Sequence, residues 1–217
     1  MAKVNSKTDR DISIVSKEFI WDDAGPSEAN IFVLPTIERL LKLSLASKIL
    51  DLGCGNGYLT GYLSEQGYDI TGCDYSQTGI DLAKKQFPAV SFFQQDLTLP
   101  LPTEQLAAYD TVISTEVIEH LLLPRKLMDN ALSALKPKGT LIVSAPYHGY
   151  LKNLALALTN GFDRHWHPLR DYGHVKFFSK KTLIKLFEEA DLSDIHFETV
   201  GRIPVFARSM IVSGVKR

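Results

Sequence analysis

Short apolar runs alternate with segments of helical periodicity through most of the chain. Residues 111–115 form a β-branched apolar run of the kind found in central parallel strands. Apolar residues spaced three and four apart predict helices between such runs, and strands that alternate with helices indicate an α/β fold. The pattern predicts strands at 48–52, 69–73, 90–94, 111–115 and 140–144, helices at 57–66, 77–87, 124–136 and after Ser179, and closing strands at 194–200 and 206–215.

The segment before the first strand has a different pattern. Residues 1–12 are polar and charged, so we expect them to be disordered or loosely attached. Ser27 is a suitable N-cap for a helix, and an apolar stripe continues that helix to about residue 47. We expect Pro35 to break or restart this helix, because proline lacks a backbone N–H.

Composition and charge narrow the class of protein. Apolar residues make up 45% of the chain, enough for a sizeable core, and a net charge of −1 gives no overall field that favours nucleic acid or an anionic membrane. Cys54 and Cys73 lie beside predicted strand ends, so we expect small buried residues rather than a disulfide, which fits a reducing compartment. With no apolar signal sequence and no run of about 18 apolar residues, we expect a soluble cytoplasmic protein, monomeric or homodimeric.

The candidate chemistry begins at the end of the first predicted strand. Gly53, Gly55 and Gly57 occupy every second position there, directly before a predicted helix. Glycine allows a sharp turn that brings bare backbone against a ligand, and a helix N-terminus presents free N–H groups. A dinucleotide fingerprint, Gly-x-Gly-x-x-Gly, would need glycine or alanine where this chain has Tyr58. The loop also lacks the lysine and following serine or threonine of a phosphate-binding P-loop.

The segment Asp51-Leu-Gly53-Cys-Gly55-Asn-Gly57 resembles the first motif of the class I S-adenosylmethionine-dependent methyltransferases. The Leu-Lys-Pro-x-Gly turn at 135–139 is similar to a turn of the same family. A structural turn in another Rossmann-like fold is the alternative. The resemblance covers roughly residues 46–217 and implies an α/β three-layer sandwich with a seven-stranded, mostly parallel sheet and an antiparallel C-terminal hairpin. We expect residues 1–217 to form a single methyltransferase domain.

The resemblance also implies roles for two acids at later strand ends. Asp74 lies 23 residues after Asp51, where the family has the carboxylate that accepts hydrogen bonds from the ribose hydroxyls, although it could be a helix N-cap. Asp96 stands where the family reads the adenine, although it could be a turn carboxylate. The implied S-adenosylmethionine site has Asp51, Gly53, Cys54 and Gly55 at the methionine end, Asp74, Tyr75, Asp96 and Leu97 at the ribose and adenine, Thr115 and Glu116 at the sulfonium, and Trp21 on a lid.

Two segments are expected to cover the site, as in relatives of this type. Residues 1–45 are the expected N-terminal lid region, with Phe19 and Trp21 as lid residues or as ordinary core anchors. Residues 147–178 are the expected cap over the acceptor pocket and hold four of the six histidines. Residues 151–158 should form an apolar helix that lines the pocket, touches a membrane surface or packs on the core. Candidate acceptor-binding residues are Tyr147, His148, His165 and His174, and the pair His165 and His167 has strand-like spacing.

The segment after the fourth strand offers the candidate catalytic groups. Glu116, Glu119 and His120 would project to one side if this turn were helical. The Glu-x-x-Glu-His pattern resembles that of metal-dependent ribose and quinone-precursor O-methyltransferases, so a divalent cation is one interpretation, with His174 as a distant fourth ligand. A metal-free His120 that acts as general base or binds the substrate, beside Glu116, is favoured over the cation. A structural His120 behind the pocket wall is the third interpretation.

The expected activity is methylation of an oxygen on a small, partly aromatic or apolar molecule. The histidine-rich cap, the apolar lid and the absence of a basic surface support this expectation. N-methylation is the close alternative, and a catalytically silent cofactor-binding module is a different class of hypothesis. RNA methylation rests on the Glu-x-x-Glu-His similarity alone, and the near-zero net charge leads us to expect no nucleic-acid partner.

Overall fold

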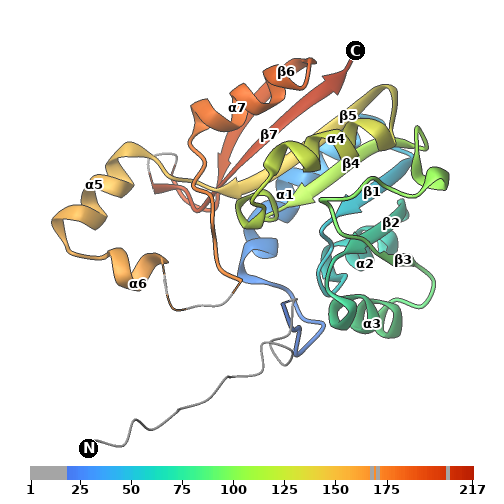
Figure 1. Cartoon of the computed structure of the whole chain (residues 1–217), viewed down its shortest axis with the longest axis horizontal. Helices are drawn as coiled ribbons and strands as arrows, with labels where there is room; N and C mark the ends of the chain where they lie inside the picture. Colours follow the sequence, from blue (N-terminus) through green and yellow to red (C-terminus); the bar gives the residue numbers. More distant parts are fainter. Residues whose placement is uncertain (1–18, 167–168, 170–171, 204–205) are drawn as a thin grey trace, which may run out of the picture.

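The computed structural model describes residues 19–166, 169, 172–203 and 206–217, so the expectation for residues 1–12 lies outside the described part. Its centre is a seven-stranded sheet with the order β3-β2-β1-β4-β5-β7-β6 (Figure 1). The first five strands run parallel, and β7 is antiparallel to both β5 and β6. The predicted fold and C-terminal hairpin are confirmed. The strands are β1 (Lys48–Leu52), β2 (Asp69–Asp74), β3 (Ser91–Gln94), β4 (Tyr109–Thr115), β5 (Leu135–Pro146), β6 (Leu192–Val200) and β7 (Ser209–Lys216).

Helices cover both faces of the sheet and complete the three layers (Figure 1). Successive side chains of a strand point to opposite faces, so β1 contributes to two cores. Leu50 and Leu52 pack in the core under α4 and α7, whereas Ile49 packs in the core under α1 and α2. The helices are α1 (Glu28–Leu43), α2 (Tyr58–Glu65), α3 (Gln77–Gln86), α4 (Pro124–Ala134), α5 (Tyr150–Leu158), α6 (Phe162–Trp166) and α7 (Lys180–Glu189).

The first helix differs from its prediction. Ser27 is the N-cap, as predicted, and its Oγ accepts a hydrogen bond from the Asn30 N–H. The predicted break at Pro35 is wrong, because α1 runs through that residue without interruption. An interior proline costs about 3 kcal/mol. Burial of three side chains at about 1.5–3 kcal/mol each outweighs that cost; these are Val33, Ile37 and Leu41, all fully buried.

Two further local predictions are wrong. β5 begins at Leu135, so the predicted turn at 137–139 lies inside the strand, where Lys138 has a φ of +66°. The strand-like spacing assigned to His165 is also wrong, because this residue lies in the short helix α6, while His167 lies outside the described residues. The expectation of two small, buried, unpaired cysteines is confirmed. In the described part of the chain, no helix has both the length and the apolar character needed to cross a membrane.

The position of α1 leads to a stability prediction. Leu41 is fully buried against the sheet, whereas Leu43 on the same helix is 70% exposed. Leu41→Ala should lower the free energy of unfolding by about 2–5 kcal/mol, because it leaves a cavity in the core, and Leu43→Ala should change it by less than about 0.5 kcal/mol. Urea denaturation of both variants tests this. Equal effects would mean that α1 is not part of the cooperatively folded core.

Candidate functional site

The loop between β1 and α2 has a backbone that only glycine adopts readily. Gly53, Gly55 and Gly57 have φ values of +86°, +56° and +76°, in the left-handed region that other residues seldom occupy. Two side chains also lie in close contact with the loop. A Cβ on Gly53 would lie 2.4 Å from the Val117 side chain, and one on Gly55 would lie 2.4 Å from the Trp21 ring. The loop thus joins the turn after β4 to the N-terminal segment.

Asp51 is a buried carboxylate directly before the loop. The Thr60 hydroxyl donates to its Oδ2 at 2.7 Å, while Oδ1 is buried with no hydrogen-bond partner among the described residues. Burial, with a smaller contribution from the negative charge of Asp74, raises the pKa of Asp51 to about 7. A buried acceptor without a donor is costly, so this atom is suited to a ligand that brings a donor or a positive charge. The Cys54 thiol, by contrast, packs behind the loop near Gly72.

Asp74 ties the loop to the start of α3. Its Oδ2 accepts the Gly55 N–H and its Oδ1 accepts the Ser76 N–H, each at 2.8 Å. Ser76 is the N-cap of α3, so the alternative in which Asp74 caps that helix is wrong. Tyr75, which is 44% exposed, follows directly. The acid and the aromatic ring therefore stand at the same sheet edge as the glycine loop.

The segment after β3 reaches the same edge. The Gln95 N–H donates to the Asp74 carbonyl at 2.8 Å, which brings Asp96 close to Asp74. Asp96 Oδ1 accepts hydrogen bonds from the Thr98 N–H and hydroxyl, both at 2.8 Å, so this carboxylate also stabilises a turn. Leu97 is 5% exposed. Asp51, Asp74 and Asp96 therefore follow or end three neighbouring parallel strands at the same end of the sheet.

A strap formed by residues 19–25 crosses the glycine loop. The Trp21 N–H donates to the Thr78 hydroxyl at 3.2 Å, and the Ser76 hydroxyl donates to the Phe19 carbonyl at 2.7 Å. The Asn56 amide donates to two strap carbonyls, at 2.9 and 2.8 Å. The sequence analysis identified Trp21 but missed Asn56, Ser76 and Thr78. A Cβ added at Gly79 would lie 2.9 Å from the Trp21 ring. The glycine at this position is the sequence feature that could have indicated a close contact there.

Glu116 stands at the end of β4 in a strained conformation. Its φ is +56°, and its N–H donates to the Ser144 hydroxyl, which in turn donates to the Glu116 carboxylate at 2.8 Å. Burial raises the pKa of Glu116 to about 7. The condition that residues 116–120 form one helical turn is not met, because only Ile118–His120 form a short 3-10 helix. Thr115, which pairs with Ser144 in the sheet, is half-buried beside it.

Glu119, His120 and His174 come together although 54 positions separate the two histidines. One possible ligand atom from each lies within 4.8 Å of the others, and the two imidazole centroids are 4.9 Å apart. The Glu119 carbonyl accepts the N–H groups of Val175 and Lys176, both at 2.9 Å. These backbone bonds hold the end of the 147–178 segment against the turn after β4.

The protonation of this cluster follows from its contacts. His120 Nδ1 lies 3.0 Å from the Tyr172 carbonyl oxygen, and because a carbonyl only accepts, Nδ1 carries the hydrogen and Nε2 the lone pair. Glu119 is 1% exposed, and both its carboxyl oxygens lack a hydrogen bond to any described group. Burial raises the pKa of Glu119 well above its usual range, with a further contribution from Glu116.

The cap segment contains an aromatic cluster. The His148 ring lies 4.6 Å from Trp166 and 5.6 Å from Phe177, between centroids, and 6.4 Å from His165. Burial lowers the pKa of His148 to about 4, so its ring is neutral at pH 7. No residue of α5 is buried, so the alternative in which this helix packs on the core is wrong. Figure 1 shows α5 and α6 projecting away from the sheet.

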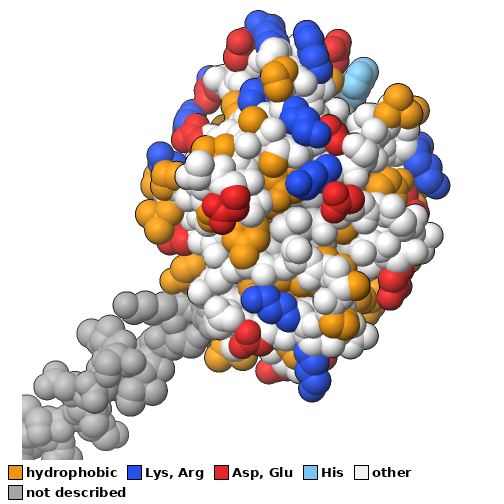
Figure 2. Space-filling view, turned by 90° about the vertical axis from the view of Figure 1, so that its right-hand side faces the viewer, with side chains coloured by type: hydrophobic (Ala, Val, Ile, Leu, Met, Phe, Trp, Pro, Cys, Tyr) orange, Lys and Arg blue, Asp and Glu red, His pale blue; other side chains and the backbone are white. Residues whose placement is uncertain are grey.

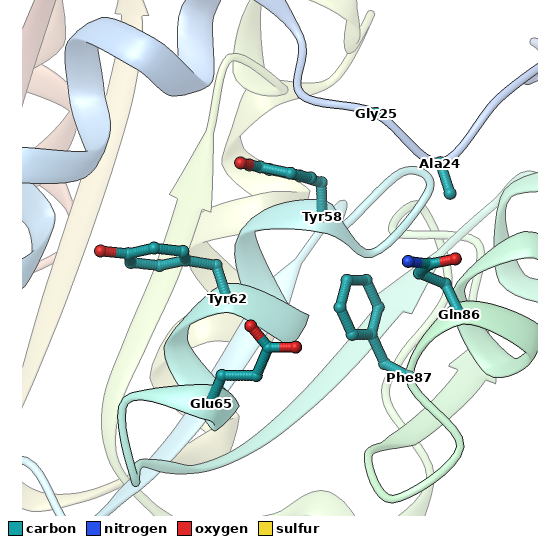
Figure 3. A pocket seen from close by; sticks show the side chains of 7 residues that line it. All are labelled: Ala24, Gly25, Tyr58, Tyr62, Glu65, Gln86 and Phe87. Carbon is teal, nitrogen blue, oxygen red and sulfur yellow. The ribbon is translucent and has the colours of Figure 1, made fainter.

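A cavity of about 410 Å³ lies outside this constellation, between the strap, α2 and α3 (Figure 3). Tyr58 and Tyr62 of α2 face it together with Phe87, and none of the expected site residues lines it. Figure 2 shows basic and acidic side chains interspersed on the face it displays. That face carries no dense basic patch.

The chain matches the family described as "Methyltransferase domain" over residues 28–196. It is 26% identical over 182 residues to ubiquinone biosynthesis O-methyltransferase of Idiomarina loihiensis, which covers 81% of this chain and 75% of that protein. A protein of the same name from Rickettsia bellii is 28% identical over 149 residues, 67% of this chain and 61% of that protein.

Solved structures share the fold. Magnesium protoporphyrin IX methyltransferase from Synechocystis PCC 6803 with bound SAH has a TM-score of 0.65 at 21% identity, over 85% of this chain and 82% of that chain. A SAM-dependent methyltransferase from Archaeoglobus fulgidus has a TM-score of 0.60 at 16% identity, over 84% of this chain and 94% of that chain.

The sheet order and the glycine loop define a class I S-adenosylmethionine-dependent methyltransferase. Since the family match spans most of the sequence, the chain belongs to the methyltransferase domain family, and the predicted resemblance is confirmed.

The raised pKa of Asp51 gives a prediction for stability against pH. The pKa of about 7 in the folded state lies above the ordinary aspartate pKa of 3.8, so between these pH values the folded state holds a proton that the unfolded state releases. The free energy of unfolding should therefore fall as the pH rises through this window. The full decline expected from this shift is up to about 4 kcal/mol. It should be absent in Asp51→Asn. Urea denaturation between pH 4 and pH 8 measures it, with Asp81→Asn on the exposed face of α3 as control; parallel curves for wild type and Asp51→Asn would contradict the assignment.

Proposed function

We propose that this methyltransferase transfers the methyl group of S-adenosylmethionine to an oxygen of a small-molecule acceptor. The observation that carries the proposal is the contact between Val117 and Gly53, because it sets the turn of Glu119 and His120 against the cofactor loop. The relatives named ubiquinone biosynthesis O-methyltransferase support oxygen as the accepting atom. N-methylation would need no group that accepts a hydroxyl proton. His120 is such a group, so its presence favours O-methylation.

The residues around the loop fit S-adenosylmethionine. The unpartnered Oδ1 of Asp51 suits the ammonium of the methionine end, next to Gly53, Cys54 and Gly55. Each carboxylate oxygen of Asp74 accepts a backbone hydrogen bond, and a carboxylate oxygen can accept more than one, so the ribose hydroxyls could donate there too. We assign the adenine to Tyr75, Asp96 and Leu97, and the sulfonium to Thr115 and Glu116. When bound, the cofactor supplies a methyl group that is already activated.

The N-terminal strap and the cap segment complete the proposed site within a single domain. Residues 1–45 act as the lid region, with Trp21 on the loop as its described contact. Residues 147–178 act as the cap, in which Tyr147, His148 and His165 line the acceptor side. The strap hydrogen bonds must remain or re-form around the cofactor, which would exclude water from the methyl group.

His120 is the proposed general base. With its hydrogen on Nδ1, His120 uses Nε2 to take the acceptor's hydroxyl proton while the oxygen bonds to the methyl carbon and the carbon–sulfur bond breaks. S-adenosylhomocysteine and a methyl ether are the products. Glu116, held by Ser144, and His174, in edge-to-face contact with His120, position the base. Both residues contribute by orienting His120 so that the acceptor oxygen lies in line with the sulfur–methyl bond.

A second candidate is cation-assisted methylation by the same residues. It is favoured by one observation: in the described part of the chain, both buried carboxyl oxygens of Glu119 lack a hydrogen bond, and they lie beside two imidazoles. Glu119, His120 and His174 would hold a divalent cation such as Mg²⁺ or Mn²⁺. Such an ion would lower the pKa of the acceptor hydroxyl as a Lewis acid. Because the ion would occupy Nε2 of His120, the two candidates exclude each other at that atom.

The proposed activity is tested with radiolabelled S-adenosylmethionine and matched panels of phenols, aliphatic alcohols and amines. Label transfer to a hydroxyl compound is expected. Transfer to amines alone would mean that the methyl-accepting atom is nitrogen. Tight cofactor binding without transfer to any compound would instead identify a catalytically silent module.

Asp74→Ala should weaken binding of S-adenosylhomocysteine by about 1–3 kcal/mol, the range for losing a hydrogen bond with a charged partner. Isothermal titration calorimetry measures the change. Asp81→Ala, an exposed acid of α3, is the matched control and should bind as wild type does. Unaltered affinity in Asp74→Ala would remove the ribose assignment.

His120→Ala should lower kcat at least about 100-fold, as expected for losing a general base, and leave cofactor affinity nearly unchanged. Adding EDTA and then Mn²⁺ or Mg²⁺ separates the two candidates. If activity disappears with EDTA and returns with the ion, and Glu119→Gln abolishes the response, the cation candidate holds. Full activity in EDTA leaves His120 as the base, and wild-type turnover in His120→Ala would exclude both roles.

A further inference from the structure

Three basic side chains gather where β5 leaves the sheet toward α5. The Lys152 ammonium donates to the Tyr147 carbonyl at 3.1 Å, and the Tyr147 N–H donates to the Arg208 carbonyl at 2.9 Å. Arg208 and Arg202 belong to the loop between β6 and β7, which Figure 1 shows beside the chain that enters α5. Residues far apart in the sequence thus bring three positive charges together.

The positive charge of this cluster is poorly balanced. Arg208 pairs with Glu28 at 3.2 Å, but Glu28 is 89% exposed, and such surface pairs contribute little. Neither Lys152 nor Arg202 forms an ion pair with a carboxylate in the described part of the chain. Lys152 is half-buried; its burial and the charges of Arg202 and Arg208 lower its pKa, and the Glu116 carboxylate offsets only part of this shift. Like charges in a partly buried place favour a bound anion.

The cluster faces the proposed acceptor site. Ser209, directly after Arg208, pairs with Pro146 across the sheet and lies close enough to Glu116 to lower the pKa of its carboxyl. His148, which is 9% exposed and has a buried Nδ1 without a hydrogen-bond partner in the described chain, lies within electrostatic reach of both Lys152 and His174. A molecule between α5 and the turn after β4 would therefore meet Lys152 on one side and His120 on the other.

We propose that the acceptor carries an anionic group, a carboxylate or a phosphoryl group, which binds to Lys152, Arg202 and Arg208 while its hydroxyl is presented to His120. This inference rests on the proposed O-methylation and names the class of molecule methylated. Arginine recognises both groups through paired hydrogen bonds, and lysine adds a point charge. Glu28 competes for Arg208 only from an exposed position, so an anion can replace it.

The test compares acceptors that differ in one charge. A dihydroxybenzoate, the matching dihydroxybenzamide and the matching dihydroxyphenylphosphonate share the ring and the hydroxyls. With wild-type protein, both anionic probes should have a kcat/KM at least about tenfold above that of the amide. The better of the two anions distinguishes a carboxylate from a phosphoryl group. Equal values for all three probes would overturn the proposal.

Variants assign the effect to the cluster. Lys152→Met should raise KM for the anionic probes about tenfold or more, with kcat and the KM of the amide unchanged. Arg202→Met, at an exposed position, should act in the same direction and serves if Lys152→Met does not fold. Lys185→Met on α7, 65% exposed, is the matched control. An unaltered preference for the anions in both cluster variants would overturn the proposal.

The binding readout separates this inference from the proposed activity. Calorimetry with S-adenosylhomocysteine present should show that the benzoate binds more tightly than the amide, and that Lys152→Met removes the difference. If no probe is methylated but this difference is found, the proposed O-methylation fails and the anion site stands. If the amide is methylated and the benzoate binds no better, the activity stands and the anion site fails.

Discussion

The site depends on the two hydrogen bonds that Asp74 accepts from the Gly55 and Ser76 N–H groups. One carboxylate thereby joins the loop after β1 to the start of α3, and the Gln95 N–H on the Asp74 carbonyl adds the segment after β3. Backbone N–H groups at strand ends would otherwise need water as a partner. The same acid that would bind a ribose therefore also holds together the walls of its groove.

Buried acids without full partners are concentrated around this groove. Asp51, Glu116 and Glu119 each have a raised pKa caused first by burial, and Glu116 also has a left-handed backbone. A chain under selection for stability alone would replace such groups with apolar residues. Strain and unsatisfied charge cluster where a ligand or a reaction uses them. The three acids lie at the ends of β1 and β4, where the proposed methyl transfer occurs.

Local patterns predicted the sheet and the cofactor side of the site. The glycine spacing, Asp51 and the acid after the second strand are short-range features, and parallel strands bring their ends together. Pro35 was misread because burial of Val33, Ile37 and Leu41 is a tertiary effect. The helical turn considered for 116–120 does not form, because the Glu116 conformation depends on Ser144, 28 residues away. The sequence offered His174 as a partner of Glu119 only within the metal interpretation, and it gave no sign of the approach of Lys152 to Arg208, because both depend on long-range packing.

The two sides of the proposed acceptor site differ in charge. Buried acids stand near the glycine loop, whereas basic groups that are only partly balanced stand near α5. An anionic acceptor would be oriented by this gradient before any specific contact forms, because partly buried charges are weakly screened. Its hydroxyl end would then face His120, whose Nδ1 is held by the Tyr172 carbonyl. Since Lys152 belongs to α5 itself, this helix would orient the acceptor through charge as well as through its exposed apolar side chains.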